Sequence, residues 1–472
     1  MHVKHPFERK TSFKMRFSSL HPHDKENKEQ RRFWWRLLFS LLAVILLVIG
    51  CYAGLAYWNN RNQVVASGHK VDGSPVALKV NARSALVIDA STGQILGQKN
   101  ANQKVGIASQ SKMLTAYAVL QAIKKGDYDW NTPVKVTQSS DWSDKDNAMY
   151  AHLEVHNGET LTVKELFDAM FTTSANDASL ALADFAKKKS ETQQEFLQRW
   201  AKKLGLTNSD WYNAAGQVND DAFDYRVKSA SATAENQATP KDLAVLAYQI
   251  VSADPDVRKY YDKVGLVYRP NANEAATKIK LTEGGKFDQE IKGKLNNPNN
   301  LTVEGLKTGS TPSSGGGLTG LIKDQNGHEF ITVVSGAGKY TDSKERYQVT
   351  LDAVNQVLNE QQPITVAKNT KVSGQTKNAW SKTGRVQLVA KEARTYWVKR
   401  ATKVSSLSFA HVARQNSQSL SDDETVRWLS PELKASYLPT VSKEVHDLPL
   451  TNQEMMEQTT RWGYYSHWLF KW

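Results

Sequence analysis

The sequence predicts an α/β fold followed by a small β-rich domain, and changes in hydrophobic periodicity indicate both. Residues 84–100 alternate between apolar and polar and turn at Ser91–Gly93, which is typical of a strand, a turn and a second strand. Residues 126–260 mostly carry apolar side chains at the i, i+3, i+4 spacing of helices. After residue 300 the pattern returns to strands, and short strand-like segments continue beyond residue 363.

An uncharged segment near the N-terminus predicts a membrane anchor. Residues 1–36 carry ten Lys or Arg and four Asp or Glu, a net charge of +6, and residues 37–57 contain no charge. A helix of this length reaches about 31 Å, which is enough to cross a bilayer. The positive-inside rule places residues 1–36 in the cytoplasm and the chain after residue 58 outside it. We therefore expect a single-pass membrane protein.

Alternatives to an uncleaved anchor stay open at this point. A buried helix of a soluble protein is one, although the segment lacks a polar face. A cleaved signal peptide is another, since Ala53 and Ala56 follow the most apolar part. The only cysteine, Cys51, stands in the sequence VIGC, which resembles a lipoprotein cleavage box, but a bulky tyrosine follows it. With no other cysteine, the exported part has no structural disulfide.

The exported part divides into a linker and two domains. Residues 58–82 are polar and predict a linker, residues 83–362 form the main domain, and residues 363–472 form the C-terminal β-rich domain. The C-terminal segment RWGYYSHWLFKW suits either a membrane surface or a packed strand. The net charge of the whole chain is +13. Removing the N-terminal tail leaves +7 for the exported part. Such a charge is typical of a solvated basic surface, and attraction to anionic wall polymers or lipid head groups is the alternative. Nucleic acid is not an expected partner outside a cell.

Helices and strands of the main domain follow in order. Residues 108–125 predict a helix with a basic last turn and Gly126 as its stop. Residues 162–188 predict further helices, and residues 239–251 predict one that opens with Thr239 as its N-cap. The strands after residue 300 include two that meet at Asn326–Gly327, a strong hairpin signal, before a last helix over residues 346–361.

Three short motifs occur in a fixed order within the main domain. They are S-x-x-K at Ser109–Lys112, S-x-N at Ser174–Asn176 and K-T-G at Lys307–Gly309. Ser67–Lys70 and Lys382–Gly384 repeat two of them in polar surroundings outside this domain, and we treat both as coincidences. Each motif alone is weak evidence, because serine, lysine and glycine are common. Their order, spacing and context together are specific.

This set resembles the signature of the penicillin-binding serine D,D-peptidases and related β-lactamases. Residues 83–362 more closely resemble the D-alanyl-D-alanine carboxypeptidases, the low-molecular-mass penicillin-binding proteins. The resemblance lies in LVIDASTGQILGQKNANQKVGIASQSKMLTAY, NGETLTVKELFDAMFTTSANDASLALA, TPKDLAVLA and EGLKTGSTPSSGGGLTG. It implies a transpeptidase/β-lactamase-like domain, in which helices and a helical subdomain flank an antiparallel sheet. Many of these enzymes also carry a small C-terminal β domain.

The same resemblance implies an activity, a substrate and a location. The enzyme removes the terminal D-Ala from peptidoglycan stem peptides that end in D-Ala-D-Ala, through an acyl-enzyme and without metal or cofactor. β-Lactams are the implied covalent inhibitors. The catalytic domain of such an enzyme lies on the extracytoplasmic side of a bacterial cell membrane.

The chemistry of the first motif follows from the residues themselves. A serine hydroxyl is a poor nucleophile until a base removes its proton. Lys112, one turn from Ser109, is placed to do so provided that burial and neighbouring positive charge lower its pKa. Ser109 then forms the acyl-enzyme. By resemblance, Ser174 returns a proton to the departing amine, and Asn176 holds Lys112 and the substrate amide.

The resemblance also implies the residues that bind substrate. Lys307 and Thr308 bind the terminal carboxylate, and Arg346 is the best match for an arginine that assists them. Gly309 lets its strand approach an extended substrate, which pairs as an added strand. The backbone N–H groups of Ser109 and Ser310 form the oxyanion hole. Glu304 stands where many relatives have Asp, and the stretch STPSSGGG is unusually small, so substrate range or acylation rate could differ.

Other functions are weaker on the sequence. A class A β-lactamase needs a deacylating glutamate in an E-x-x-L-N-like loop between the second and third motifs, and none is found. A D,D-endopeptidase or transpeptidase uses the same residues, and a non-catalytic wall-binding scaffold would leave them idle. His152 and His156 lack the H-E-x-x-H pattern of a zinc site, and SGAGKY lacks the pattern of a phosphate loop.

Overall fold

The protein is described by a computed structural model that covers residues 33–38, 40, 42–45, 70–261, 263, 265–271, 277–279, 282–402, 407–415 and 419–470. The chain divides into two compact units, Met1–Gly68 and His69–Trp472. The described residues of the first unit are helical. The predicted anchor over residues 37–57 lies mostly outside the described residues. Among the helices that are described, none combines the length and the apolar content that a membrane crossing requires.

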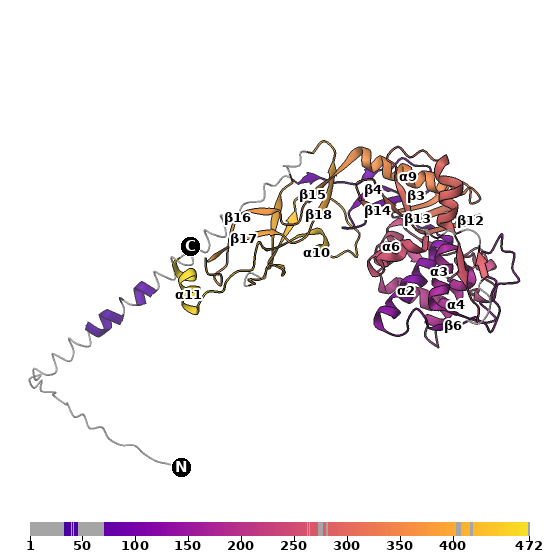
Figure 1. The fold of residues 1–472 in the computed structure, drawn as a ribbon, viewed down its shortest axis with the longest axis horizontal. Coiled ribbons are helices and arrows are strands. Elements are labelled where there is room, and N and C mark those ends of the chain that lie inside the picture. Colours follow the sequence, from indigo (N-terminus) through magenta and orange to yellow (C-terminus); the bar gives the residue numbers. More distant parts are fainter. Residues whose placement is uncertain are drawn as a thin grey trace, which may run out of the picture. The chain divides into compact units, whose positions relative to one another are not determined.

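The second unit is built on a six-stranded sheet (Figure 1). Across the sheet the strands are β12 (Thr302–Thr311), β13 (Gly315–Lys323), β14 (Glu329–Ala337), β3 (Ser84–Asp89), β4 (Ile95–Lys99) and β2 (Val76–Ala77). All neighbours are antiparallel except β2 and β4. The predicted hairpin between β13 and β14 is confirmed, with Gly327 at a positive φ of 84°. β12, which carries the K-T-G motif, lies at one edge of this sheet.

Helices pack on both faces of the sheet (Figure 1). On one face lie α2 (Lys112–Lys125), α3 (Val163–Thr172), α4 (Asn176–Ala186), α5 (Gln193–Lys203) and α6 (Pro240–Ala253), and on the other lies α9 (Ser343–Glu360). The predicted cap of α6 is confirmed, because the Thr239 side chain accepts a hydrogen bond from the N–H of Asp242.

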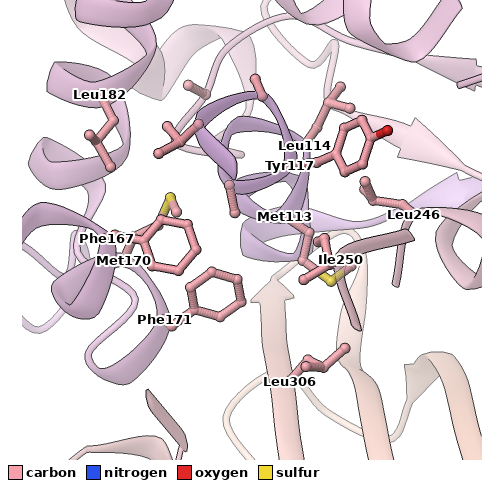
Figure 2. Packing of buried hydrophobic residues seen from close by; sticks show 14 of the residues in the cluster. Met113, Leu114, Tyr117, Phe167, Met170, Phe171, Leu182, Leu246, Ile250 and Leu306 are labelled. Carbon is pink, nitrogen blue, oxygen red and sulfur yellow. The ribbon is translucent and has the colours of Figure 1, made fainter. Parts of the chain in front are cut away.

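The pleat of the sheet explains why both faces are covered. Along β3, Leu86 and Ile88 join the core beneath the helices α2–α6, whereas Ala85 and Val87 join the core beneath α9. Successive side chains of a strand point to opposite faces, so an uninterrupted apolar strand needs cover on both sides. Figure 2 shows the first of these cores, where Met113 of α2 packs near Ile250 of α6.

Short elements connect these helices and strands. They are β5 (Val105–Gly106), η1 (Ala108–Ser111), β6 (Pro133–Lys135), β7 (Thr160–Thr162), β8 (Ser209–Asp210), η2 (Asn219–Tyr225), β9 (Gln237–Ala238), η3 (Pro255–Val257), α7 (Arg258–Tyr261), β10 (Leu266–Tyr268), β11 (Thr277–Ile279), α8 (Glu283–Lys286), η4 (Phe287–Ile291) and η5 (Lys292–Lys294).

A β-rich part begins directly after α9. Its strands are β15 (Gln361–Val366), β16 (Lys371–Lys377), β17 (Arg385–Ala390), β18 (Arg394–Lys399), β19 (Phe409–Gln415), β20 (Arg427–Pro431), β21 (Leu433–Lys434) and β22 (Leu448–Asn452), with α10 (Lys443–His446) between the last two. Five of them form one sheet in the order β16-β17-β22-β20-β19. The aromatic C-terminal segment forms the helix α11 (Arg461–Phe470), rather than the strand considered above.

Part of the predicted linker belongs to the folded unit. Within residues 58–82, β1 (Val71–Asp72) pairs with β21 of the β-rich part, and β2 joins the main sheet. The side chain of Gln94 exchanges two hydrogen bonds with the backbone of Trp397, and the Trp397 indole N–H donates to Asp89 at 2.9 Å. Buried contacts of this kind join the main sheet to the β-rich part.

Candidate active site

The predicted nucleophile lies in a tight turn that precedes α2. The sequence predicts a helix over residues 108–125, but its first turn is the 3-10 helix η1 and the α-helix begins at Lys112. Ala108 has a positive φ of 45°, an uncommon conformation for a residue with a Cβ atom. The Ser111 hydroxyl donates to the Ala108 carbonyl at 2.5 Å and closes the turn. Ser109 is therefore held at the start of the helix, half-buried.

Lys112 is completely buried, and its ammonium nitrogen lies against three oxygen atoms. Its Nζ is 2.7 Å from Ser109 Oγ, 2.8 Å from Asn176 Oδ1 and 2.5 Å from the Ala215 carbonyl oxygen. A buried ammonium loses its hydration, which disfavours the charged form. The geometry therefore suits proton transfer between Ser109 and Lys112.

The S-x-N motif lies at the junction of α3 and α4. Ser174 adopts a positive φ of 60° between the two helices, and Asn176 is the first residue of α4. The N–H of Asn176 donates to the Ala151 carbonyl at 2.7 Å. These contacts bring Asn176 to the lysine and leave Ser174 on the wall of the cavity described below.

The K-T-G motif lies on β12, beside the nucleophile turn. Lys307 is buried and donates to the Thr308 carbonyl at 3.0 Å. A Cβ atom on Gly309 would come within 2.6 Å of the Ile107 carbonyl oxygen and 2.9 Å of the Gln110 nitrogen. We predicted that the small size of Gly309 serves approach to the substrate. In the structure the absence of a side chain also lets β12 pack against η1, and the role of Gly309 at the substrate stays a prediction.

A cavity of about 410 Å³ brings the three motifs together. Its lining includes most of the predicted site residues, namely Ser109, Ser174, Asn176, Thr308, Gly309, Ser310 and Arg346. The two lysines, Lys112 and Lys307, are buried behind it. Each of the nine predicted residues is thus at or directly behind one concave surface.

Arg346 of α9 reaches this cavity from the face of the sheet opposite α2. Its side chain is buried, one terminal nitrogen donates to the Tyr340 carbonyl at 3.5 Å, and Nε has no hydrogen-bond acceptor among the described residues. A buried guanidinium with a donor to spare is suited to an anionic ligand such as a carboxylate.

Asp177 adds a buried carboxyl behind Asn176. Burial raises its pKa to about 7, although hydrogen bonds from the N–H groups of Ala178 and Leu153 favour the charged form. Next to it, the ring nitrogens of His152 face the carbonyl oxygens of Leu153 and Lys145. Asp177 and His152 therefore tie residues 145–153, which form part of the cavity wall, to the S-x-N motif.

Sequence reasoning missed two parts of the site. One is the backbone carbonyl of Ala215, which carries no side-chain signal. The other is the part of the cavity lining that is formed by Asn147, Ala148, Met149 and Ala151 and by Lys286, Glu290 and Ile291. Asn213 and Gly216 are residue types that favour turns, and they are the local signals of a turn near Ala215.

The second copy of K-T-G lies elsewhere. Lys382 is exposed and forms an ion pair with Glu457 at 2.6 Å, in the β-rich part of the chain. Neither Lys382 nor its neighbours Thr383 and Gly384 line the cavity. Treating this copy as a coincidence is consistent with its position.

Comparison with known proteins assigns the chain to a family. A sequence model of the D-alanyl-D-alanine carboxypeptidase family of serine peptidases matches residues 69–339, more than half of the chain. The chain belongs to this family. The match begins at residue 69 and includes all three motifs. Members of the family are low-molecular-mass penicillin-binding proteins. The fold is an α/β transpeptidase-like domain followed by a β-rich C-terminal domain.

Two relatives in this carboxypeptidase family illustrate the extent of the likeness. D-alanyl-D-alanine carboxypeptidase DacC of Escherichia coli is 28% identical over 263 residues, which cover 55% of this chain and 58% of that protein. D-alanyl-D-alanine carboxypeptidase DacF of Bacillus subtilis is 26% identical over 316 residues, 67% of this chain and 69% of that protein. The chain thus spans less than two thirds of the length of the Escherichia coli relative.

A solved structure has the same fold. The peptidoglycan synthesis regulatory factor from Streptococcus pneumoniae superposes with a TM-score of 0.68 at 21% identity, covering 80% of this chain and 100% of that one. At this identity the likeness concerns the fold. Its coverage of the chain includes both the main domain and the β-rich part.

Proposed function

We propose that this protein is a serine-type D-alanyl-D-alanine carboxypeptidase that removes the terminal D-Ala from peptidoglycan stem peptides. The observation that carries the proposal is the 2.7 Å approach of the buried Lys112 Nζ to Ser109 Oγ, at the base of the cavity that all three motifs form. Family membership supports the same reaction.

Acylation begins when Ser109 Oγ attacks the carbonyl carbon of the penultimate D-Ala while its proton passes to Lys112 Nζ. The negative charge that develops on the carbonyl oxygen is stabilised by the N–H groups of Ser109 and Ser310. The C–N bond then breaks as Ser174 passes its hydroxyl proton to the departing amine, which leaves as free D-Ala. Ser174 takes the proton held by Lys112 Nζ in return, so Lys112 is again neutral. Ser109 remains as an ester.

Deacylation repeats these steps with water. Lys112 takes a proton from the water as it attacks the ester carbonyl, and the proton returns to Ser109 Oγ when the ester bond breaks. The products are the shortened stem peptide and the original enzyme. A β-lactam follows the first half of this sequence and remains attached to Ser109, so we propose β-lactams as covalent inhibitors.

Substrate binding uses the free edge of the sheet. β12 has a neighbouring strand only on its β13 side in the described sheet, so an extended peptide can pair with its other edge. Lys307, Thr308 and Arg346 are placed to bind the terminal carboxylate, which positions the last peptide bond at Ser109. No cofactor is required for these steps. The site implies no metal and no nucleic acid.

We also propose that residues 37–57 anchor the protein in a bacterial cell membrane and that the catalytic unit lies outside the cytoplasm. The uncharged run between the basic residues 1–36 and the polar residues 58–82 supports this proposal. Its substrate, a wall peptide, is on that side of the membrane.

Release of D-alanine tests the proposed activity. The full chain is incubated with a pentapeptide that ends in D-Ala-D-Ala, beside Ser109→Ala and the matched control Ser252→Ala, whose hydroxyl lies on the exposed side of α6. We expect D-alanine from the wild type and from the control, and none from Ser109→Ala. Transfer of the acyl group to an added amine, or cleavage of cross-linked peptides alone, would replace this proposal with a transpeptidase or an endopeptidase. No covalent reaction at all would indicate a wall-binding scaffold.

A further inference from the structure

The two carbonyl oxygens at Lys112 constrain the direction of its lone pair. A neutral amine has two N–H bonds and one lone pair, whereas the Asn176 side-chain oxygen and the Ala215 backbone oxygen can only accept hydrogen bonds. Their distances from Nζ are 2.8 and 2.5 Å. When both N–H groups are donated to these oxygens, the lone pair is left facing Ser109 Oγ, the third neighbour at 2.7 Å. The Ala215 carbonyl therefore helps to orient the base.

The orientation of that carbonyl depends on a buried asparagine. Asn213 is completely buried, and its side-chain oxygen accepts hydrogen bonds from the N–H groups of Gly216 at 2.8 Å and Gln217 at 3.2 Å. The C=O of Ala215 and the N–H of Gly216 belong to one trans peptide and point in opposite directions. Holding the Gly216 N–H toward Asn213 thus directs the Ala215 oxygen away from Asn213 and toward Lys112.

Neighbouring contacts hold this loop in place. The Asn213 side-chain N–H donates to the Gln217 carbonyl at 2.9 Å, and the backbone carbonyl of Asn213 accepts from Asn236 at 2.8 Å. Gly216 has a positive φ of 80°, and a Cβ atom there would lie 2.2 Å from the Ala108 carbonyl oxygen. The loop over residues 213–217 is therefore pressed directly against the turn that carries Ser109.

We propose that Asn213 is a positioning residue for the reaction at Ser109: through the peptide between Ala215 and Gly216, it sets the direction of the Lys112 lone pair. The inference rests on the proposed function, since it assigns a task to the loop only if Lys112 is the general base. The Asn213 side chain forms its hydrogen bonds with the backbone of Gly216 and Gln217, so it acts on the base through the backbone.

The test compares Asn213→Ala with Asn219→Ala in the full chain. Asn219 is equally buried and also closes a loop, accepting from the Val227 N–H and donating to the Val227 and Ser231 carbonyls, but it does not contact the loop peptide at Lys112. The acylation rate with a fluorescent penicillin is measured from pH 5 to 10, beside the melting temperature. A misdirected base slows acylation by about 10- to 100-fold, given the sensitivity of such reactions to displacements of about 1 Å.

We expect both alanine variants to lower the melting temperature and Asn213→Ala alone to slow acylation.

Asn213→Asp supplies a second measurement. A buried carboxyl tends to keep its proton below neutral pH, so it then offers an acceptor and a donor as the amide does. The ionised carboxylate still accepts from the Gly216 N–H, but it has no N–H or O–H to donate to the Gln217 carbonyl, and two oxygen atoms then face each other inside the loop. We therefore expect acylation close to the wild-type rate at pH 6 and a loss of rate, relative to the wild type, as the carboxyl ionises and the loop shifts. If Asn213→Ala does not fold, the pH dependence of acylation in Asn213→Asp alone tests the inference.

Equal acylation by wild type and Asn213→Ala would overturn the inference and leave the proposed function intact, as would a wild-type pH profile for Asn213→Asp. If the wild type itself forms no adduct and releases no D-alanine, the proposed function fails and this inference fails with it. A purely structural role would lower the melting temperature of both alanine variants without any difference in acylation.

Discussion

At the scale of single residues, a carboxyl group without access to water lies next to the residue that holds Lys112. Asp177 is 1% exposed, and burial raises its pKa to about 7 from the ordinary value of 3.8. Between these two pH values the folded protein keeps a proton that the unfolded chain has lost. The folded state then binds more protons, so stability must fall as pH rises through this window.

We predict that this dependence disappears in Asp177→Asn, whose neutral amide resembles the protonated carboxyl. Other groups titrate in the same range, so the informative quantity is the difference in unfolding free energy between wild type and variant. Relative to Asp177→Asn, the wild type should lose up to about 1.4 kcal/mol per pH unit between pH 4 and pH 7. The loss should be absent below pH 3.8 and complete above pH 7. Urea unfolding at a series of pH values measures it, and a constant difference would contradict the burial argument.

The side chains of the site could be predicted residue by residue, but their backbone partners could not. Ser109 and Lys112 are recognisable because one turn of chain separates them, and that spacing is visible in the sequence. The Ala215 carbonyl reaches Lys112 across 103 residues of chain, and every residue has a carbonyl. Nothing in the amino-acid sequence distinguishes the Ala215 carbonyl from the others. The same holds for the positive φ of Ala108, since alanine does not favour that conformation.

At the scale of elements, the site depends on how closely β12 approaches η1. Gly309 stands at the contact, and the atoms that a Cβ would meet belong to the backbone, which cannot rotate away. Local periodicity predicted both segments. It did not predict their distance, because the approach of two segments 200 residues apart is decided by packing of the whole sheet against the helices.

We predict that Gly309→Ala destabilises the protein by about 1–3 kcal/mol, as expected for overpacking, and also slows acylation by moving η1 away from β12. Gly293→Ala is the matched control, because a Cβ at Gly293 meets no atom within 4 Å. Urea unfolding and penicillin acylation are measured on both variants. Wild-type stability and wild-type acylation in Gly309→Ala would show that the contact is not needed.

α9 contributes Arg346, which we place at the substrate carboxylate. We predict that Arg346→Gln lowers kcat/KM for a D-Ala-D-Ala peptide by about 10- to 100-fold, the loss expected for a hydrogen-bonded charge. The loss should be much smaller for the same peptide with its C-terminal carboxylate amidated. Lys344→Gln, an exposed change on the same helix, should alter neither rate. An equal loss on both peptides would argue against carboxylate binding by Arg346.

At the scale of the whole molecule, the main sheet and the β-rich part share buried contacts. Trp397 of β18 is fully buried, and its indole N–H donates to Asp89 at the end of β3. Strand-like segments after residue 363 predicted a separate small domain, but no feature of the sequence indicated that residues 71–77 pair with both parts. The pairing of β1 with β21 joins segments more than 300 residues apart, which periodicity cannot detect.

We predict that Trp397→Phe lowers the free energy of unfolding by about 1–3 kcal/mol, because it leaves Asp89 without one buried donor. Trp462→Phe, at a position where the tryptophan is 78% exposed, should have little effect. Acylation at low temperature should be the same in both, since Trp397 lies outside the cavity. Unchanged stability in Trp397→Phe would mean that the contact does not join the two parts energetically.

The most direct test of the account is the intact mass of the protein after reaction with penicillin, followed by mapping of the modified peptide. We predict one penicilloyl group per chain, attached to Ser109 and absent from Ser109→Ala. An adduct on another residue, or no adduct on the folded wild type, would contradict the assignment of Ser109 and Lys112 as nucleophile and base.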